Sequence, residues 1–150
     1  MNPTADIRHV LVAHDFSETS DAALDYGLGL AQKLGARVTV VHAYEIPSHG
    51  APEVLVLSTD WTEQFEAVAR QELDKVIASV RKRGLDATPA LRKGVAWREI
   101  DAAAAETKAD LIVIGSEGRT GVGRALLGSV AEKVVRTAPC PVLVVRRGAP

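Results

Sequence analysis

The sequence predicts an α/β protein built on a five-stranded parallel sheet, because short apolar runs alternate with helical segments along the chain. The apolar runs are rich in valine, leucine and isoleucine, as expected of strands that are buried on both faces. Each segment between them is long enough to be a crossover helix. Since strand–helix–strand units in one sheet are parallel and right-handed, this alternation favours a parallel sheet whose connections are helices.

The first two strands are expected at residues 7–13 and 38–43, with one helix between them. Ser17 or Thr19 can cap the start of that helix, and Gly35 supplies its stop. The apolar face that would pack on the sheet consists of Ala23, Leu24, Gly27, Leu28, Ala31 and Leu34.

A loop is expected over residues 44–59, which contain two prolines and a glycine, although residues 54–57 are ambiguous. A long amphipathic helix follows and ends with the basic residues 81–83 before Gly84, where cations are favoured by the helix dipole. Its apolar residues follow a three/four spacing and are Trp61, Phe65, Val68, Ala69, Leu73, Val76, Ile77 and Val80.

The third strand is expected at residues 87–92, and Pro89 within it predicts a position at the edge of the sheet. The second half of the chain continues the alternation. Its expected elements are a helix at 97–106, a strand at 111–114, a helix at 129–137 and a strand at 142–145.

Length and composition favour one cytoplasmic domain covering residues 1–150. The net charge of −1 gives no electrostatic basis for binding nucleic acid. No apolar run reaches the ~18 residues of a membrane span, so no membrane partner is expected. Residues 1–6 lack the pattern of a signal peptide, and the single Cys140 fits a reducing compartment.

Three glycines near the C-terminus carry the functional prediction. Gly115 ends an apolar strand, Gly118 follows three residues later, and Gly128 precedes Ser129 at the start of the next helix. Glycines allow close approach of a ligand to the backbone, and a helix N-terminus attracts anions. This spacing predicts a phosphate cradle made of main chain, so nucleotide binding is the leading hypothesis.

An acidic residue after the first strand supports the same site. Asp15 and Gly115 each follow a strand at its carboxyl end, where parallel sheets bind ligands if the strand order reverses there. If the first and fourth strands are neighbours, one crevice contains both residues. Asp15 can also be explained as a turn residue or as a cap of the first helix.

At these positions the chain resembles the universal stress protein family, in particular its members that bind ATP or AMP. The resemblance rests on residues 12–17, residues 41–43, the glycine motif from Gly115 to Ser129, and residues 138–145. It implies a doubly wound sheet in the order 3-2-1-4-5, with helices on both faces, like that of the adenine nucleotide alpha-hydrolases. It also implies a homodimer and a role in the stress response.

The resemblance assigns roles to individual residues. Asp15 would bind the ribose, and the base would lie against Ala13, Ala43 and Ile114. The resemblance also implies a divalent ion (Mg²⁺ or Mn²⁺) held through the phosphates and water. By its charge alone, Arg119 is expected either to neutralise the phosphates or to be solvated. The phosphates themselves would be held by Gly115, Ser116, Gly118, Gly128, Ser129 and Val130.

Two residues depart from the family's pattern. Ala13 stands where the family often has proline, and Glu117 stands where it commonly has histidine. A carboxylate beside a triphosphate is unfavourable unless it points away, pairs with Arg119 or faces a metal. Residues 129–132 also have the sequence of a capping box, which would give Ser129 a role in the helix itself.

Three other functions remain as alternatives. A slow ATPase or phosphotransferase is one, although neither a P-loop motif nor a kinase motif set is present and no catalytic residue is assigned. A nucleotide-independent dimeric stress protein is another. A phosphoacceptor receiver domain would need an aspartate after the third strand, where Arg92 and Lys93 stand. The four histidines and Cys140 show no spacing typical of metal or nucleophilic sites.

The last strand predicts how two copies would associate. An apolar strand at a sheet edge leaves its N–H and C=O groups unpaired unless another chain covers them. Pairing across a two-fold axis would satisfy those groups. A homodimer is therefore expected through Val142, Leu143, Val144 and Val145.

Overall fold

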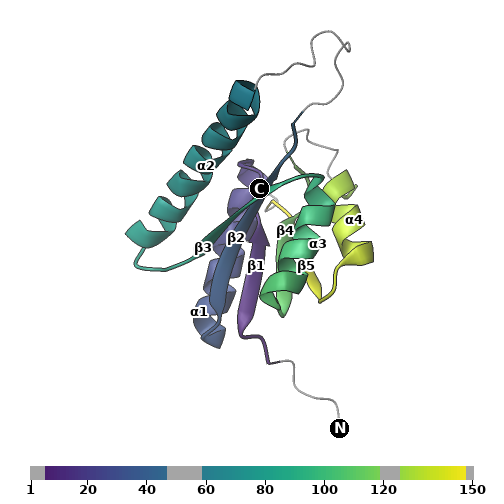
Figure 1. The fold of residues 1–150 in the computed structure, drawn as a ribbon. Helices are drawn as coiled ribbons and strands as arrows, with labels where there is room; N and C mark the ends of the chain where they lie inside the picture. Colours follow the sequence, from purple (N-terminus) through teal and green to yellow (C-terminus); the bar gives the residue numbers. More distant parts are fainter. Residues whose placement is uncertain (1–5, 47–58, 119–125, 148–150) are drawn as a thin grey trace.

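The computed structural model describes residues 6–46, 59–118 and 126–147, in which strands and helices alternate. The ambiguous residues 54–57 and Arg119 lie outside these ranges. Figure 1 shows the arrangement. In chain order the elements are β1 (His9–Ala13), α1 (Glu18–Leu34), β2 (Arg37–Tyr44), α2 (Thr59–Lys82), β3 (Thr88–Lys93), α3 (Ala96–Thr107), β4 (Leu111–Gly115), α4 (Ser129–Thr137) and β5 (Val142–Val145).

The five strands form one parallel sheet in the order β3-β2-β1-β4-β5, which confirms the predicted fold class. The chain moves outward from β1 to β3 and then returns to place β4 on the other side of β1. Val10 of β1 lies opposite Leu111 of β4, and Val12 lies opposite Val113. The strand order therefore reverses between β1 and β4, and their carboxyl ends open into the same space.

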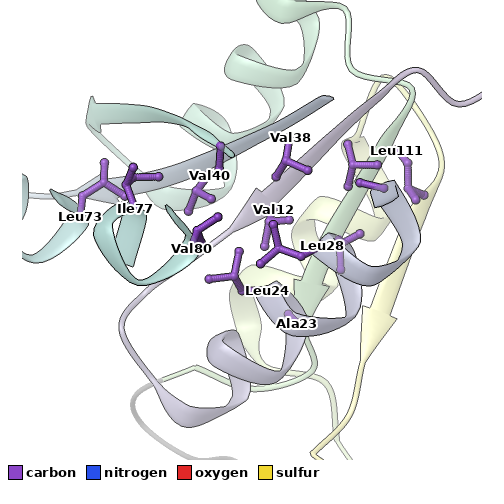
Figure 2. Close-up of a cluster of buried hydrophobic side chains, with 14 residues drawn as sticks. Val12, Ala23, Leu24, Leu28, Val38, Val40, Leu73, Ile77, Val80 and Leu111 are labelled. Atoms are coloured by element: carbon purple, nitrogen blue, oxygen red, sulfur yellow. The ribbon is translucent and has the colours of Figure 1, made fainter. Parts of the chain in front are cut away.

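Helices cover both faces of the sheet, so the fold is doubly wound. Side chains alternate along β1: Val10 and Val12 pack with α1 and α2, whereas Leu11 and Ala13 pack with α3 and α4. Figure 2 shows the first of these two cores, in which Leu24 and Leu28 of α1 and Val80 of α2 lie against the strand residues on one face of the sheet. The two cores fix the sheet between its helical layers.

Helix α1 begins and ends as the sequence predicts. The Ser17 hydroxyl accepts a hydrogen bond from the Ser20 N–H, and Gly35 adopts the left-handed conformation with φ of 66°. The apolar face was predicted one residue too long, because the Leu34 side chain is 47% exposed. Leu34 stands in the last turn, beside the stop at Gly35, where the chain turns into β2.

The first turns of α2 depart from the expected burial. Trp61, Phe65 and Val68 continue the apolar spacing but are 54%, 39% and 60% exposed, and burial begins only at Ala69. The helix has 24 residues, about 36 Å at 1.5 Å per residue. The neighbouring strand β2 has eight residues and spans about 26 Å. A helix this long extends beyond the sheet that would cover it.

No helix in the described part of the chain is long and apolar enough to cross a membrane.

Candidate functional site

A cavity of about 290 Å³ opens at the carboxyl end of the sheet. Its walls come from the ends of β1, β2 and β4, the loop after β4, and the first turns of α1, α3 and α4. Most of the residues that the sequence suggested for a nucleotide line this one cavity. They are Ala13, Asp15, Ala43, Ile114, Gly115, Gly118, Gly128, Ser129 and Val130.

Ser116, which was also predicted to hold the phosphates, is not among the residues that line the cavity. Its N–H donates to the carbonyl of Val145 at 2.8 Å, and its own carbonyl accepts from the Gly128 N–H at 2.6 Å. These bonds tie the loop after β4 to β5 and to the start of α4. The N–H groups of Ser116 and Gly128 are therefore used within the protein. Beyond the strand residue Gly115, the candidates for an anion are the N–H groups of Gly118, Ser129 and Val130.

The start of α4 differs from the capping box that the sequence suggested. Gly128 is the N-cap residue, with extended backbone angles, and no side chain in the described chain caps this helix. Ser129 is the first helical residue and is exposed, so its hydroxyl lies one position too late to act as a cap. The capping-box prediction is wrong, because the hydrogen bond from Gly128 to Ser116 sets where the helix begins.

Each glycine of the motif lies close to a neighbouring part of the protein. A Cβ atom on Gly115 would lie 2.8 Å from Thr19 Cγ2, and one on Gly118 would lie 2.7 Å from Asp15 Oδ2. A Cβ atom on Gly128 would lie 3.2 Å from the Cα of Glu117. The absent side chains thus bring α1, the loop after β4 and α4 together before any ligand is considered.

Asp15 forms the turn that the sequence allowed and also lines the cavity. One carboxylate oxygen accepts from the N–H and the hydroxyl of Ser17, which forms a turn into α1. The other oxygen faces Gly118 across the cavity wall. Phe16, which lies between Asp15 and Ser17, has φ of 66°, a conformation that non-glycine residues seldom adopt. The turn therefore holds the Asp15 carboxylate at the edge of the cavity.

The histidines near the cavity are held by hydrogen bonds. His14 Nδ1 accepts from the Phe16 N–H, and His14 Nε2 lies 2.9 Å from the Asp21 carboxylate. His42 Nδ1 lies 2.7 Å from the His14 carbonyl, and its ring stacks on Phe16 with centroids 4.2 Å apart. These contacts shape the turn after β1. In the ranges that the structure describes, no three His, Cys, Asp or Glu side chains group as a metal site.

Sequence reasoning missed the wall that α3 contributes. Ala96 and Ile100, from the first turns of α3, line the cavity. Arg92 fixes this helix by ion pairs to Glu99 and Glu106, and the hydrogen bond to Glu106 is the main reason that the pKa of Arg92 is raised. The sequence could have predicted this wall, because the helix after the third strand must start at the carboxyl end of the sheet.

The remaining missed wall residues stand next to predicted ones. They are His14, Ser20, Val41 and Ala131. Cys140 lies elsewhere, between α4 and β5, and burial raises the pKa of its thiol, which disfavours the reactive thiolate.

The charged groups in the described lining are both acidic. Asp15 and Glu117 line the cavity, and the described lining contains no lysine or arginine. The Thr19 hydroxyl donates to Glu117 Oε1 at 3.4 Å. Positive potential in this part of the site comes from main chain, chiefly from the N-terminus of α4.

The strand order and the position of the cavity define a class of protein. It is a doubly wound α/β protein with a cavity where the strand order reverses, beside a helix N-terminus that no side chain of the described residues caps. Within that class, residues 6–146 match the Universal stress protein family. The chain belongs to this family.

Individual relatives agree over nearly the whole chain. A universal stress protein of Thermus aquaticus is 37% identical over 145 residues, which cover 91% of this chain and 97% of the relative. A solved structure from the family, from Burkholderia pseudomallei, is 31% identical with a TM-score of 0.68, covering 95% of this chain and 98% of its own. A universal stress protein solved in complex with cAMP is 27% identical with a TM-score of 0.64, covering 93% and 97%.

Proposed function

We propose that this chain binds an adenine nucleotide, ATP or AMP, in the cavity at the carboxyl end of the sheet, and that binding serves a regulatory role in the stress response. One observation carries the proposal. The loop from Gly115 to Gly118, the start of α4 and Asp15 line the same cavity, although they are far apart in the sequence. The similarity to a family member solved with cAMP supports an adenine nucleotide as the ligand.

The apolar part of the cavity suits a base. Ala13 and Ala43 lie near the carboxyl ends of the neighbouring strands β1 and β2. Their small side chains leave room in the cavity, and Ile114 adds an apolar wall. A cavity of about 290 Å³ lies near the lower end of the roughly 300–1,000 Å³ typical of small-molecule sites. We assign the adenine to this region.

The polar part suits a sugar phosphate. The N–H groups of Gly118, Ser129 and Val130 are the candidates for the phosphate, since anions bind at uncapped helix N-termini. Asp15 accepts hydrogen bonds, and in the same role it would bind a ribose hydroxyl. Arg119, beyond the described residues, stays a candidate for the phosphates.

A divalent ion such as Mg²⁺ or Mn²⁺ would be held mainly by the nucleotide. The described residues offer no three-ligand cluster, but Glu117 and Asp15 are oxygen donors of the type that these hard ions prefer. The ion would neutralise phosphate charge. The protein's contribution would be to orient the phosphate chain and to supply a carboxylate.

The most direct test is to identify what the purified protein carries. Denaturation followed by chromatography should release AMP or ATP at close to one per chain. If the protein is purified empty, titration calorimetry with AMP and with ATP and magnesium should show one site per chain. Absence of binding in both experiments would refute the proposal and favour a nucleotide-independent protein.

We propose further that the chain forms a homodimer through β5. This strand lies at the edge of the sheet, and its four valine and leucine residues, Val142–Val145, are only half-buried. A second copy would satisfy the outer N–H and C=O groups. Light scattering coupled to size exclusion should report a mass near twice that of one chain at micromolar concentration. A monomer would contradict this assignment.

A further inference from the structure

We infer that Glu117 selects the phosphate chain of the bound nucleotide: the site binds AMP without metal and admits ATP only together with a divalent cation. The inference rests on the proposed adenine-nucleotide function and concerns the same cavity. It starts from the one carboxylate that stands on the loop between the glycines.

The backbone of Glu117 lies between two contacts within the protein. On one side Ser116 is hydrogen-bonded to Val145 and to Gly128, at 2.8 and 2.6 Å. On the other side a Cβ atom on Gly128 would lie only 3.2 Å from the Glu117 Cα. The loop is therefore fixed against both β5 and α4, and the position of Glu117 is part of the fold.

The side chain of Glu117 is also held. Its Oε1 accepts from the hydroxyl of Thr19, a residue that is only 3% exposed and that packs on Gly115. Thr19 belongs to the first turn of α1, where the helix dipole favours a negative charge. Within residues 6–46, 59–118 and 126–147, Glu117 has no ion-pair partner. The carboxylate thus lies on the α1 side of the cavity.

The starts of α1 and α4 line different sides of the region that we assign to the phosphates. We place a single phosphate at the amides of Ser129 and Val130, on the α4 side of the cavity. A triphosphate brings more negative charge along the loop that carries Glu117. The like charges repel at a partly exposed site where water screens them incompletely. A divalent cation reverses this effect, because it binds carboxylate and phosphate oxygens together.

The experiment compares three ligands on wild type and two variants by titration calorimetry: AMP with EDTA, ATP with EDTA, and ATP with magnesium. For wild type, ATP with EDTA should bind on the order of a hundredfold more weakly than AMP, and magnesium should recover most of the loss. E117Q, which keeps an oxygen for Thr19, should improve ATP binding in EDTA by at least about tenfold and leave AMP within about threefold.

The matched control is E72Q, which makes the same change of charge on the outer face of α2. Glu72 pairs with Lys75 there and does not line the cavity. It should leave all three affinities as in wild type. Circular dichroism and thermal unfolding verify that both variants fold.

The possible failures are distinguishable. If AMP and ATP bind equally well in EDTA, and E117Q changes neither, the role of Glu117 is refuted while the proposed nucleotide function stands. An equal gain for E72Q would also refute it, since the effect would then belong to net charge. If no variant binds either nucleotide under any condition, the proposed function itself fails, and this inference with it.

Discussion

The two ends of the sheet differ in how their main-chain polar groups are satisfied. At the amino end, Asp110 Oδ2 accepts from the N–H groups of Arg8 and His9, at 2.9 Å each. The buried His9 ring lies between the Thr107 carbonyl and the Thr39 hydroxyl, at 3.1 and 2.7 Å. Side chains at this end therefore satisfy both the loop before β4 and the start of β1.

At the carboxyl end, neither α3 nor α4 has a side-chain cap at its start among the described residues. Helix α1 is closed by the Ser17 hydroxyl and has Glu18 and Asp21 in its first turn, whereas α4 begins at Gly128 without a side-chain cap. The cavity lies at this open start. The amino end therefore contributes to stability, whereas the carboxyl end keeps main-chain donors at the cavity in which we propose that the nucleotide binds.

The largest expected effect comes from filling the carboxyl end at Gly118. In Gly118→Val the new Cβ would lie 2.7 Å from Asp15 Oδ2, and the branched side chain would occupy the space assigned to the phosphates. Nucleotide binding should become undetectable by calorimetry, while the far-ultraviolet circular dichroism should stay that of the folded protein.

Gly29→Ala is the matched control. Gly29 is an exposed helical glycine of α1, and a Cβ atom there would meet nothing within 4 Å. This variant should bind as wild type and be up to about 1 kcal/mol more stable, because alanine favours the helix. Wild-type affinity in Gly118→Val would show that the phosphates lie elsewhere.

The second effect separates the two functions of Asp15. Asp15→Ala should weaken nucleotide binding by about 1–3 kcal/mol, because it removes a charge-assisted hydrogen bond to the sugar. It also removes the acceptor for Ser17 and should reduce stability. Asp15→Asn keeps that acceptor, so it should retain stability and still lose part of the affinity. Calorimetry and urea unfolding of both variants measure the two contributions, and equal affinities in all three proteins would place the ribose elsewhere.

Most of the fold could be predicted from the sequence because burial follows periodicity. Alternating strands and helices specified the sheet, and Pro89 correctly marked β3 as an edge strand. Periodicity contains no information on how far a neighbouring element extends, so the exposure of Trp61 and Val68 could not be anticipated. The order of the strands required the family resemblance, since alternation alone fits several orders.

The site was predictable only in part. Glycine spacing pointed to the loop from Gly115 to Gly118 and to the start of α4, which do line one cavity. The spacing did not reveal that Ser116 uses its N–H on Val145, or that Gly128 replaces Ser129 at the cap position. Both depend on contacts between β5, the loop and α4 that form only in the folded chain.

A smaller effect distinguishes the two helix starts. Ser17→Ala removes the hydroxyl that accepts from Ser20 and should destabilise the protein by about 1 kcal/mol. Ser129→Ala removes an exposed hydroxyl that caps nothing and should change the free energy of unfolding by less than about 0.5 kcal/mol. Urea unfolding checks both. A loss at Ser129 as large as that at Ser17 would restore the capping box.

The smallest effect concerns the amino end and appears as a pH dependence. Burial is the main reason that the pKa of His9 is lowered from its usual 6.5, and the charge of Arg37 adds to it, while the Thr107 carbonyl and Asp110 oppose it. Below about pH 6.5 the unfolded chain therefore binds a proton that folded His9 resists, so stability falls as the pH decreases through this range. The stability lost in this way is fully present above about pH 6.5, where His9 is neutral in the folded and the unfolded chain.

His9→Gln should remove this part of the pH dependence, because glutamine does not titrate and can still bond to Thr39 or Thr107. Unfolding free energies measured by urea between pH 5 and 7.5 should fall less steeply for His9→Gln than for wild type. The pH dependence of nucleotide affinity should be the same in both proteins, because His9 lies at the end of the sheet opposite the cavity. Identical slopes in the two proteins would show that His9 accepts its proton in the folded state as readily as in the unfolded one.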